Sequence, residues 1–237
     1  MTNDHYENYY LMKRNKIILS ILAVVVILII AVLYFPTSQN DKTIKDNIQS
    51  EAVDYTIVAF GDSLTAGYGL PLYESYPAQL EDALHKDGLN VKVINAGVSG
   101  ETTKGNNERA EFIRGTNPDM VIWGIGGNDA LRALPVSDMK DNMESTIRIL
   151  QSGANPPKLI MLQMQAPLNA GAQYKKEFDM VYTDLAQKYN VKLVPFLVLD
   201  VFFNQNLMLP DRIHPNKDGY AKLVNDNLLG VVLGEIK

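Results

Sequence analysis

A serine, a histidine and an aspartate in this sequence could together carry out nucleophilic acyl transfer. The hydroxyl of Ser63 becomes a nucleophile only when a base takes its proton, and that base needs an orienting acid. Of the three histidines, His214 is the best candidate base, because His5 lies in the N-terminal tail and His85 near the end of a charged amphipathic segment. Asp211 stands three residues before His214 and can reach the same imidazole if the chain makes a tight turn.

Attack on an acyl carbonyl creates an oxyanion, which needs preorganised hydrogen-bond donors. Gly97 can supply a backbone N–H with no side chain in the way, Asn128 a side-chain amide and Ser63 its own N–H. These residue types are also common in plain turns and at helix caps, so each has a structural explanation as well. We expect the neighbouring Asp62 and Asp129 to fix their loops through backbone hydrogen bonds rather than to transfer protons.

Strand and helix patterns alternate along the chain and place the candidate residues at strand ends. Short apolar runs predict five buried strands, at residues 55–60, 91–94, 120–125, 158–162 and 191–194. Stripes of apolar residues predict helices near 76–84, 139–150, 178–189 and 220–228, and a polar stretch predicts one at 102–114. This alternation indicates a parallel sheet covered by helices on both faces, and such folds bind ligands at the carboxyl ends of their strands.

The composition excludes several classes of protein. The chain of 237 residues has no cysteine, so it has no disulfide, no cysteine-ligated metal and no thiol nucleophile. The whole chain has a net charge of −5. The first 16 residues carry +1 and residues 17–35 carry none, so residues 36–237 carry −6. An acidic body of this kind argues against a general nucleic-acid partner.

Residues 17–35 form an uncharged, almost wholly apolar run. A helix of this length rises about 1.5 Å per residue and nearly crosses a ~30 Å hydrocarbon core. Three cations precede the run: Lys13, Arg14 and Lys16. We therefore expect a cytoplasmic tail at 1–16, a single-pass transmembrane anchor at 17–35, a linker at 36–54 and one extracytoplasmic domain at 55–237. A cleaved signal peptide, which would release a secreted protein, is the alternative, although its apolar region is usually shorter, about 7–15 residues.

Four segments resemble the sequence blocks of the SGNH, or GDSL, hydrolase family: GDSLTAGYG at 61–69, NAGVSGETT at 95–103, GGNDALR at 126–132 and DRIHPN at 211–216. The similarity spans about residues 56–229 and is greatest to the bacterial thioesterase/lysophospholipase/arylesterase branch. One departure is Glu101, where relatives often have aspartate, and we expect little consequence from it.

The resemblance implies a flavodoxin-like three-layer α/β/α sandwich with a five-stranded parallel sheet. It implies Ser63 as nucleophile, His214 as general base and then acid, and Asp211 as the residue that orients His214. It further implies an oxyanion hole made by Ser63, Gly97 and Asn128, with no metal and no cofactor.

The substrate is less well determined by the sequence. Apolar residues at 196–203 and 207–209 lead into the segment that holds Asp211 and His214, and they could form either an acyl-binding groove or the core of a packed loop. We expect a monomer that cleaves carboxylic esters: lysophospholipids, aryl esters or short to medium acyl esters, thioesters included. The alternatives are a deacetylase of O-acetylated polysaccharide or peptidoglycan with the same triad, and a catalytically silent, membrane-tethered binding module.

Overall fold

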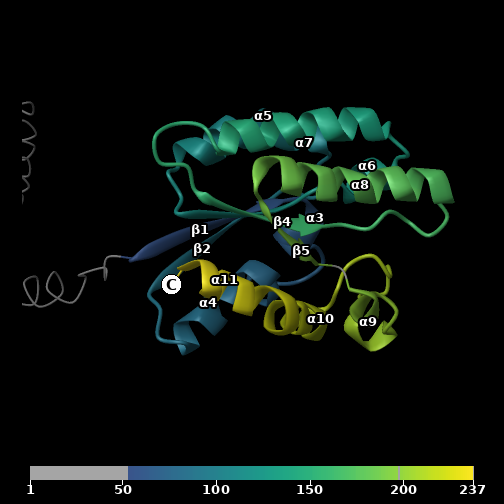
Figure 1. The fold of residues 1–237 in the computed structure, drawn as a ribbon. Coiled ribbons are helices and arrows are strands. Elements are labelled where there is room, and N and C mark those ends of the chain that lie inside the picture. The colour runs from purple at the N-terminus through teal and green to yellow at the C-terminus, as the bar shows by residue number, and fades with distance from the viewer. Residues whose placement is uncertain (1–52, 197, 237) are drawn as a thin grey trace, which may run out of the picture. The chain divides into compact units, whose positions relative to one another are not determined.

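The computed structural model describes residues 53–196 and 198–236, and its centre is one five-stranded parallel sheet (Figure 1). The strands are β1 (Tyr55–Gly61), β2 (Val91–Gly97), β3 (Met120–Gly124), β4 (Lys158–Gln163) and β5 (Lys192–Pro195). Their order in the sheet is β2-β1-β3-β4-β5, and every neighbouring pair is parallel. All five predicted strands are therefore present, within a few residues of the expected bounds, in a doubly wound order.

Helices cover both faces of the sheet, as the alternating pattern predicts (Figure 1). One layer holds α5 (Thr103–Gly115), α7 (Val136–Leu150) and α8 (Ala172–Tyr189). The opposite layer holds α4 (Tyr76–Lys86), α10 (Lys217–Leu223) and α11 (Leu229–Ile236). The helix predicted at 220–228 is thus longer than expected, because a π-helical turn at Val224–Leu228 joins α10 to α11.

The two central strands are buried along almost their whole length, which explains why they read as unbroken apolar runs. Phe60 in β1 is fully buried, and Trp123 in β3 is only 1% exposed. The indole N–H of Trp123 donates to the side-chain oxygen of Asn106 in α5, 2.7 Å away, so its one polar group is satisfied inside the core.

Three short helices follow the carboxyl ends of the strands, and the sequence pattern does not predict them. They are α3 (Ser63–Ala66) after β1, α6 (Gly127–Leu131) after β3 and α9 (Leu199–Phe202) after β5. Each is too short to show a 3.6-residue apolar repeat. At Gly61 the carboxyl ends of β1 and β3 pack closely, because a Cβ at this position would lie 2.2 Å from the carbonyl oxygen of Gly124.

The predicted tail, anchor and most of the predicted linker, residues 1–52, lie outside the described residues. Within residues 53–196 and 198–236, no helix is both long enough and apolar enough to span a membrane.

Candidate active site

Ser63 lies at the first position of α3, directly after strand β1. The carboxylate of Asp62 caps this helix by accepting the N–H of Leu64 at 3.0 Å. The N–H of Ser63 has no protein acceptor among the described residues, because it is one of the unpaired donors at the start of a helix. The turn from β1 into α3 therefore presents both the hydroxyl and a free N–H at the carboxyl edge of the sheet.

His214 reaches Ser63 from the opposite end of the chain. Its Nε2 lies 2.8 Å from Ser63 Oγ although 151 residues separate the two, and its Nδ1 lies 2.7 Å from Asp211 Oδ2. The other carboxylate oxygen of Asp211 accepts the N–H groups of Ile213 (2.9 Å) and His214 (3.0 Å). The tight turn expected at 211–214 is present, and it brings Ser63, His214 and Asp211 into one hydrogen-bonded series.

Hydrogen bonds keep the Asp211 carboxylate in its charged form. Burial raises its pKa, but hydrogen bonds from the His214 ring and from two backbone N–H groups outweigh that effect and lower the pKa below its usual value. A permanently charged Asp211 can hold the His214 imidazole in one orientation and stabilise its protonated form. The ring of Tyr68 lies 4.8 Å from the His214 ring, and His214 is buried.

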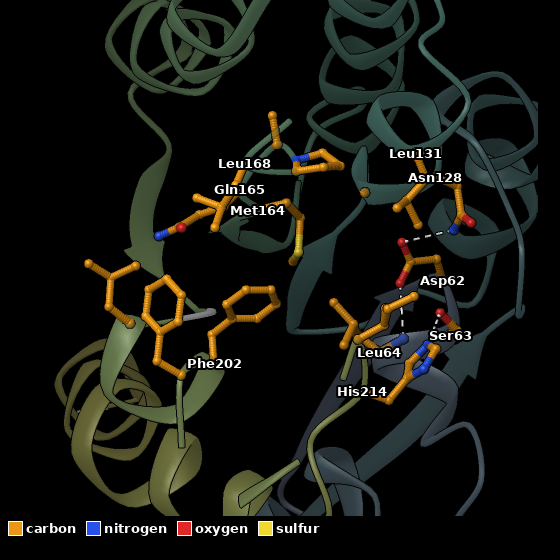
Figure 2. A pocket seen from close by; sticks show the side chains of 16 residues that line it. Asp62, Ser63, Leu64, Asn128, Leu131, Met164, Gln165, Leu168, Phe202 and His214 are labelled. Atoms are coloured by element: carbon orange, nitrogen blue, oxygen red, sulfur yellow. Dashed lines mark hydrogen bonds between the residues drawn. The ribbon is translucent and has the colours of Figure 1, made fainter. Parts of the chain in front are cut away.

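Asn128 lies near the start of α6 and faces the same space as Ser63 (Figure 2). Its side-chain N–H donates to Asp62 Oδ2 at 3.3 Å, which leaves the second amide hydrogen for a ligand. Burial raises the pKa of Asp62 to about 7, although the hydrogen bonds from Leu64 and Asn128 oppose this and nearby Glu101 and Asp129 add to it.

The expectation that Asp62 and Asp129 fix their loops is confirmed. Asp62 accepts the Leu64 N–H, as described. The Asp129 carboxylate accepts the backbone N–H of Thr103 at 2.9 Å and its hydroxyl at 2.6 Å, which ties α6 to the start of α5.

The geometry does not support the oxyanion role predicted for Gly97. Its N–H already donates to the Asn95 side-chain oxygen at 3.0 Å, so this donor is not free for an oxyanion. A Cβ at this position would lie 2.2 Å from the backbone nitrogen of Ala66, so close packing against α3 explains the glycine. The competing acceptor, the side chain of Asn95, lies two residues earlier in the same sequence block.

Gly100, in the same loop, has the free backbone N–H that we expected of Gly97. The N–H of Gly100 has no acceptor among the described residues, and its φ of +81° suits glycine. Its carbonyl accepts a hydrogen bond from Arg132 Nη2 at 2.8 Å, and Arg132 immediately follows the helix that carries Asn128. The loop that follows β2 is therefore held against α6 at this glycine.

The departure at Glu101 has a structural role in the same loop. Its carboxylate binds Arg109 through two hydrogen bonds of 2.7 and 2.6 Å and accepts the Asn106 amide at 2.9 Å. Arg109 also donates to the carbonyl of Ala96 at 3.1 Å. The pair thus connects α5 to the end of β2, which agrees with the expectation that Glu101 has no direct part in the chemistry.

A cavity of about 330 Å³ opens beside Ser63 and His214 (Figure 2). Its walls are mostly apolar side chains: Leu64, Leu131, Met164, Ala166, Pro167, Leu168, Leu199, Phe202, Phe203 and Ile213. Part of the apolar stretch at 196–209 packs in the core, and another part lines the groove, so each of the two interpretations holds for some of its residues. Phe196, Val201 and Met208 are buried in the core, whereas Leu199, Phe202 and Phe203 face the cavity.

Among the described residues, no cluster of three acidic or histidine side chains is arranged to hold a metal ion.

A serine, an imidazole and a carboxylate in series, at the carboxyl edge of a parallel sheet and beside an apolar cavity, have the geometry of a serine hydrolase site. Residues 59–222 match the sequence model of the GDSL-like lipase/acylhydrolase family, and the chain belongs to this family. The resemblance found in the sequence blocks is thereby confirmed, and the chain is a hydrolase of ester bonds.

Similar proteins agree with this class. The arylesterase of Vibrio mimicus is 35% identical over 164 residues, covering 68% of this chain and 80% of that protein. The thioesterase 1/protease 1/lysophospholipase L1 of Escherichia coli K12 is 30% identical over 164 residues, covering 69% and 76%. The psychrotrophic esterase EstA from Pseudoalteromonas sp., solved as inhibited by monoethylphosphonate, superposes with a TM-score of 0.70 at 30% identity, covering 76% of this chain and 100% of EstA.

Proposed function

We propose that the protein is a serine acyl hydrolase that cleaves carboxylic esters with short to medium acyl chains. The observation that carries the proposal is the hydrogen-bonded series from Ser63 through His214 to Asp211, in which Ser63 and His214 line an apolar cavity. A nucleophile with a base at 2.8 Å and an orienting carboxylate at 2.7 Å is sufficient for acyl transfer, and the cavity supplies a place for the acyl chain.

In the first half of the reaction, Ser63 Oγ attacks the acyl carbonyl carbon while His214 Nε2 takes the hydroxyl proton. The carbonyl oxygen becomes an oxyanion, which receives hydrogen bonds from the Ser63 N–H and from the second amide hydrogen of Asn128. The N–H of Gly100 is the third donor in this proposal, in place of that of Gly97. The ester bond then breaks, and His214 returns the proton to the departing alcohol.

In the second half, water attacks the acyl group on Ser63, with His214 again acting as the base. The Asp211 carboxylate stays charged throughout and stabilises the imidazolium form of His214 at each proton transfer. The acid product leaves after the bond to Ser63 Oγ breaks and His214 returns the proton to that oxygen. No step requires a group from outside the chain apart from water.

The walls of the cavity support the proposed substrate class. An apolar cavity of about 330 Å³ suits an acyl chain better than an acetylated sugar, so it favours acyl esters over the deacetylase alternative. The names of the relatives, an arylesterase and a thioesterase/lysophospholipase, support esters of this kind. We include lysophospholipids, aryl esters and thioesters in the proposal.

The test is hydrolysis of a p-nitrophenyl ester series from acetate to palmitate by the full chain, with Ser63→Ala as the matched control. We expect the rate to peak between C4 and C12 and to vanish in the variant. A peak at acetate alone would favour the polysaccharide deacetylase. Folded protein that cleaves no ester in the series would contradict the proposal and favour the binding module.

We further propose that residues 17–35 anchor the protein with its hydrolase domain outside the cytoplasm. The support is the uncharged apolar run with cations on its N-terminal side. Protease added to intact cells should degrade the hydrolase domain. In untreated cells, the full-length chain should be found in the membrane fraction. Recovery of a shortened chain from the medium would instead indicate a cleaved signal peptide.

A further inference from the structure

Exposed apolar side chains gather around the mouth of the cavity. Leu131, Leu168, Leu199, Phe203 and Ile213 all line the cavity, yet each is between 42% and 68% exposed. We call these five residues the apolar rim. Single exposed apolar residues are normal on protein surfaces, but a group that converges on one site marks a surface that meets something apolar.

The apolar rim is assembled from separate parts of the chain. Leu131 ends α6, Leu168 follows β4, Leu199 begins α9 with Phe203 just beyond it, and Ile213 belongs to the turn that carries His214. Figure 2 shows Leu131, Leu168 and Phe202 around the space that Ser63 and His214 face. Because these residues come from four separate segments, poor packing of one loop does not account for their exposure.

The inner wall of the cavity is distinct from this rim. Leu64, Met164 and Ala166 line the same cavity but are at most 6% exposed, so they can enclose an acyl chain without help from the outermost residues. The exposed faces of the rim point to a second apolar contact, larger than one substrate molecule.

We infer that the apolar rim rests on a lipid surface and that ester substrates enter the cavity directly from the bilayer. This inference rests on the proposed function, because a lipid ester is the substrate that such a route would deliver. Two cations adjoin the rim, Arg132 after Leu131 and Arg212 before Ile213, and neither forms an ion pair with a carboxylate of the described residues. Phosphate groups of lipids suit such cations, although Asp200 beside Leu199 is acidic.

The anchor proposed above would also keep the domain near lipid. The predicted anchor at 17–35 is followed by 17 residues before the described domain begins at Val53. A fully extended segment of that length spans at most roughly 60 Å at about 3.3–3.6 Å per residue, so the anchor would confine the domain to a layer of about this depth beside the membrane.

A fluorescence experiment tests the lipid contact without requiring catalysis. The full chain with Phe203→Trp is mixed with phosphatidylcholine/phosphatidylglycerol vesicles whose acyl chains carry bromine, a quencher of nearby indole. The matched control is Phe112→Trp, which replaces a phenylalanine on α5 that is 74% exposed, against 60% for Phe203, and that does not line the cavity. The native Trp123 is buried and supplies a constant background, which the wild-type chain measures.

We expect bromine to quench the Phe203→Trp emission strongly and the Phe112→Trp emission little. Equal quenching of the two variants, or none in either, would overturn the inference. Quenching of neither variant, together with a concentration-dependent blue shift of the Phe203→Trp emission without lipid, would identify a second copy of the chain as the partner instead.

A kinetic experiment separates the rim from the acyl wall. One lysophospholipid is supplied either as monomers below its critical micelle concentration or within vesicles, to the wild type, to Leu168→Ser/Phe203→Ser and to Phe112→Ser. Loss of two exposed apolar contacts should lower the vesicle rate of the double variant by about tenfold more than its monomer rate. Equal losses on both forms would show that the rim only binds acyl chains. A wild type that cleaves neither form would contradict the proposed substrate, while the fluorescence result would still decide the lipid contact.

Discussion

The side-chain amide of Asn128 donates a hydrogen bond to the carboxylate of Asp62, 3.3 Å away and 66 residues earlier in the chain. Above its pKa of about 7, the Asp62 carboxylate is ionised and only accepts hydrogen bonds, so it then requires the nitrogen of the Asn128 amide to face it. Asp62 thereby sets the orientation of Asn128 and, through Leu64, the start of the helix that carries Ser63. We regard Asp62 as a positioning residue for the oxyanion site.

Replacement of Asp62 by asparagine should lower kcat with little change in KM. The new amide can donate as well as accept, which allows Asn128 to turn its oxygen inward. The expected loss is about 10- to 100-fold, below the 10²–10³ that follows loss of a whole oxyanion donor. Steady-state kinetics of Asp62→Asn, Asn128→Ala and the double variant would measure it. If the two losses multiply in the double variant, Asp62 does not act through Asn128.

The same substitution should change how stability depends on pH. Burial raises the pKa of Asp62 to about 7 from an ordinary value of 3.8, so between these pH values the folded state holds a proton that the unfolded state has lost. The free energy of unfolding of the wild type therefore falls as pH rises through this window. Asp62→Asn has no carboxyl to titrate at this position, so its free energy of unfolding should not fall in this way. The difference in free energy of unfolding, variant minus wild type, should therefore be larger at pH 8 than at pH 4 by on the order of a few kcal/mol. Urea unfolding at pH 4 and pH 8 measures the two free energies, with Ser63→Ala as the control. A difference between Asp62→Asn and the wild type that does not depend on pH would contradict the raised pKa of Asp62.

Asp211→Asn should leave the fold intact and nearly abolish ester hydrolysis. The amide can no longer hold His214 in the required tautomer or stabilise its charged form, and comparable triads lose on the order of 10³–10⁴ in kcat. Rates with p-nitrophenyl butyrate and the melting temperature, measured side by side, check both parts. A variant that keeps more than a tenth of the wild-type rate would remove Asp211 from the mechanism.

Gly97→Ala should destabilise the protein, whereas Gly115→Ala should not. The added Cβ of the first would lie 2.2 Å from the backbone nitrogen of Ala66, so α3 must shift at a cost on the order of 1–3 kcal/mol or more. The Cβ of the second would meet nothing within 4 Å at the end of α5. Thermal unfolding compares the two. An unchanged melting temperature for Gly97→Ala would show that the packing explanation for this glycine is wrong.

Met164→Ala should shift the preferred acyl chain toward longer esters. Met164 lines the cavity and is 1% exposed, so its removal enlarges the acyl site and also destabilises the protein by about 2–5 kcal/mol. Met143→Ala in α7 removes an equally buried methionine outside the cavity lining and serves as the control. The ester series measures both variants; the same chain-length profile for each would contradict the acyl site.

The sheet was predictable because its strands are buried on both faces and read as separate apolar runs. The short helices were not, since four or five residues carry no periodic signal. Their effect on the site is large: α9 places Leu199 and Phe202 at the cavity, and α6 places Asn128 opposite Asp62.

Within the candidate site, the residues that lie close together in sequence were the easiest to relate. Asp211 and His214 are three residues apart, so one tight turn is enough to bring their side chains into contact. Which of two glycines has a free N–H depends on the Asn95 side chain and could not be read from the presence of glycine. The contact between Asp62 and Asn128 joins two distant segments, and only the tertiary structure reveals it.

The separation of 151 positions between Ser63 and His214 also fixes the order in which the two are synthesised. A ribosome that builds the chain from its N-terminus finishes the nucleophile long before it has made the base. The hydroxyl of Tyr220, later still, donates to the Leu64 carbonyl and joins α10 to the helix that carries Ser63. A chain that ends before His214 therefore lacks the base of the proposed mechanism, although it already contains Ser63.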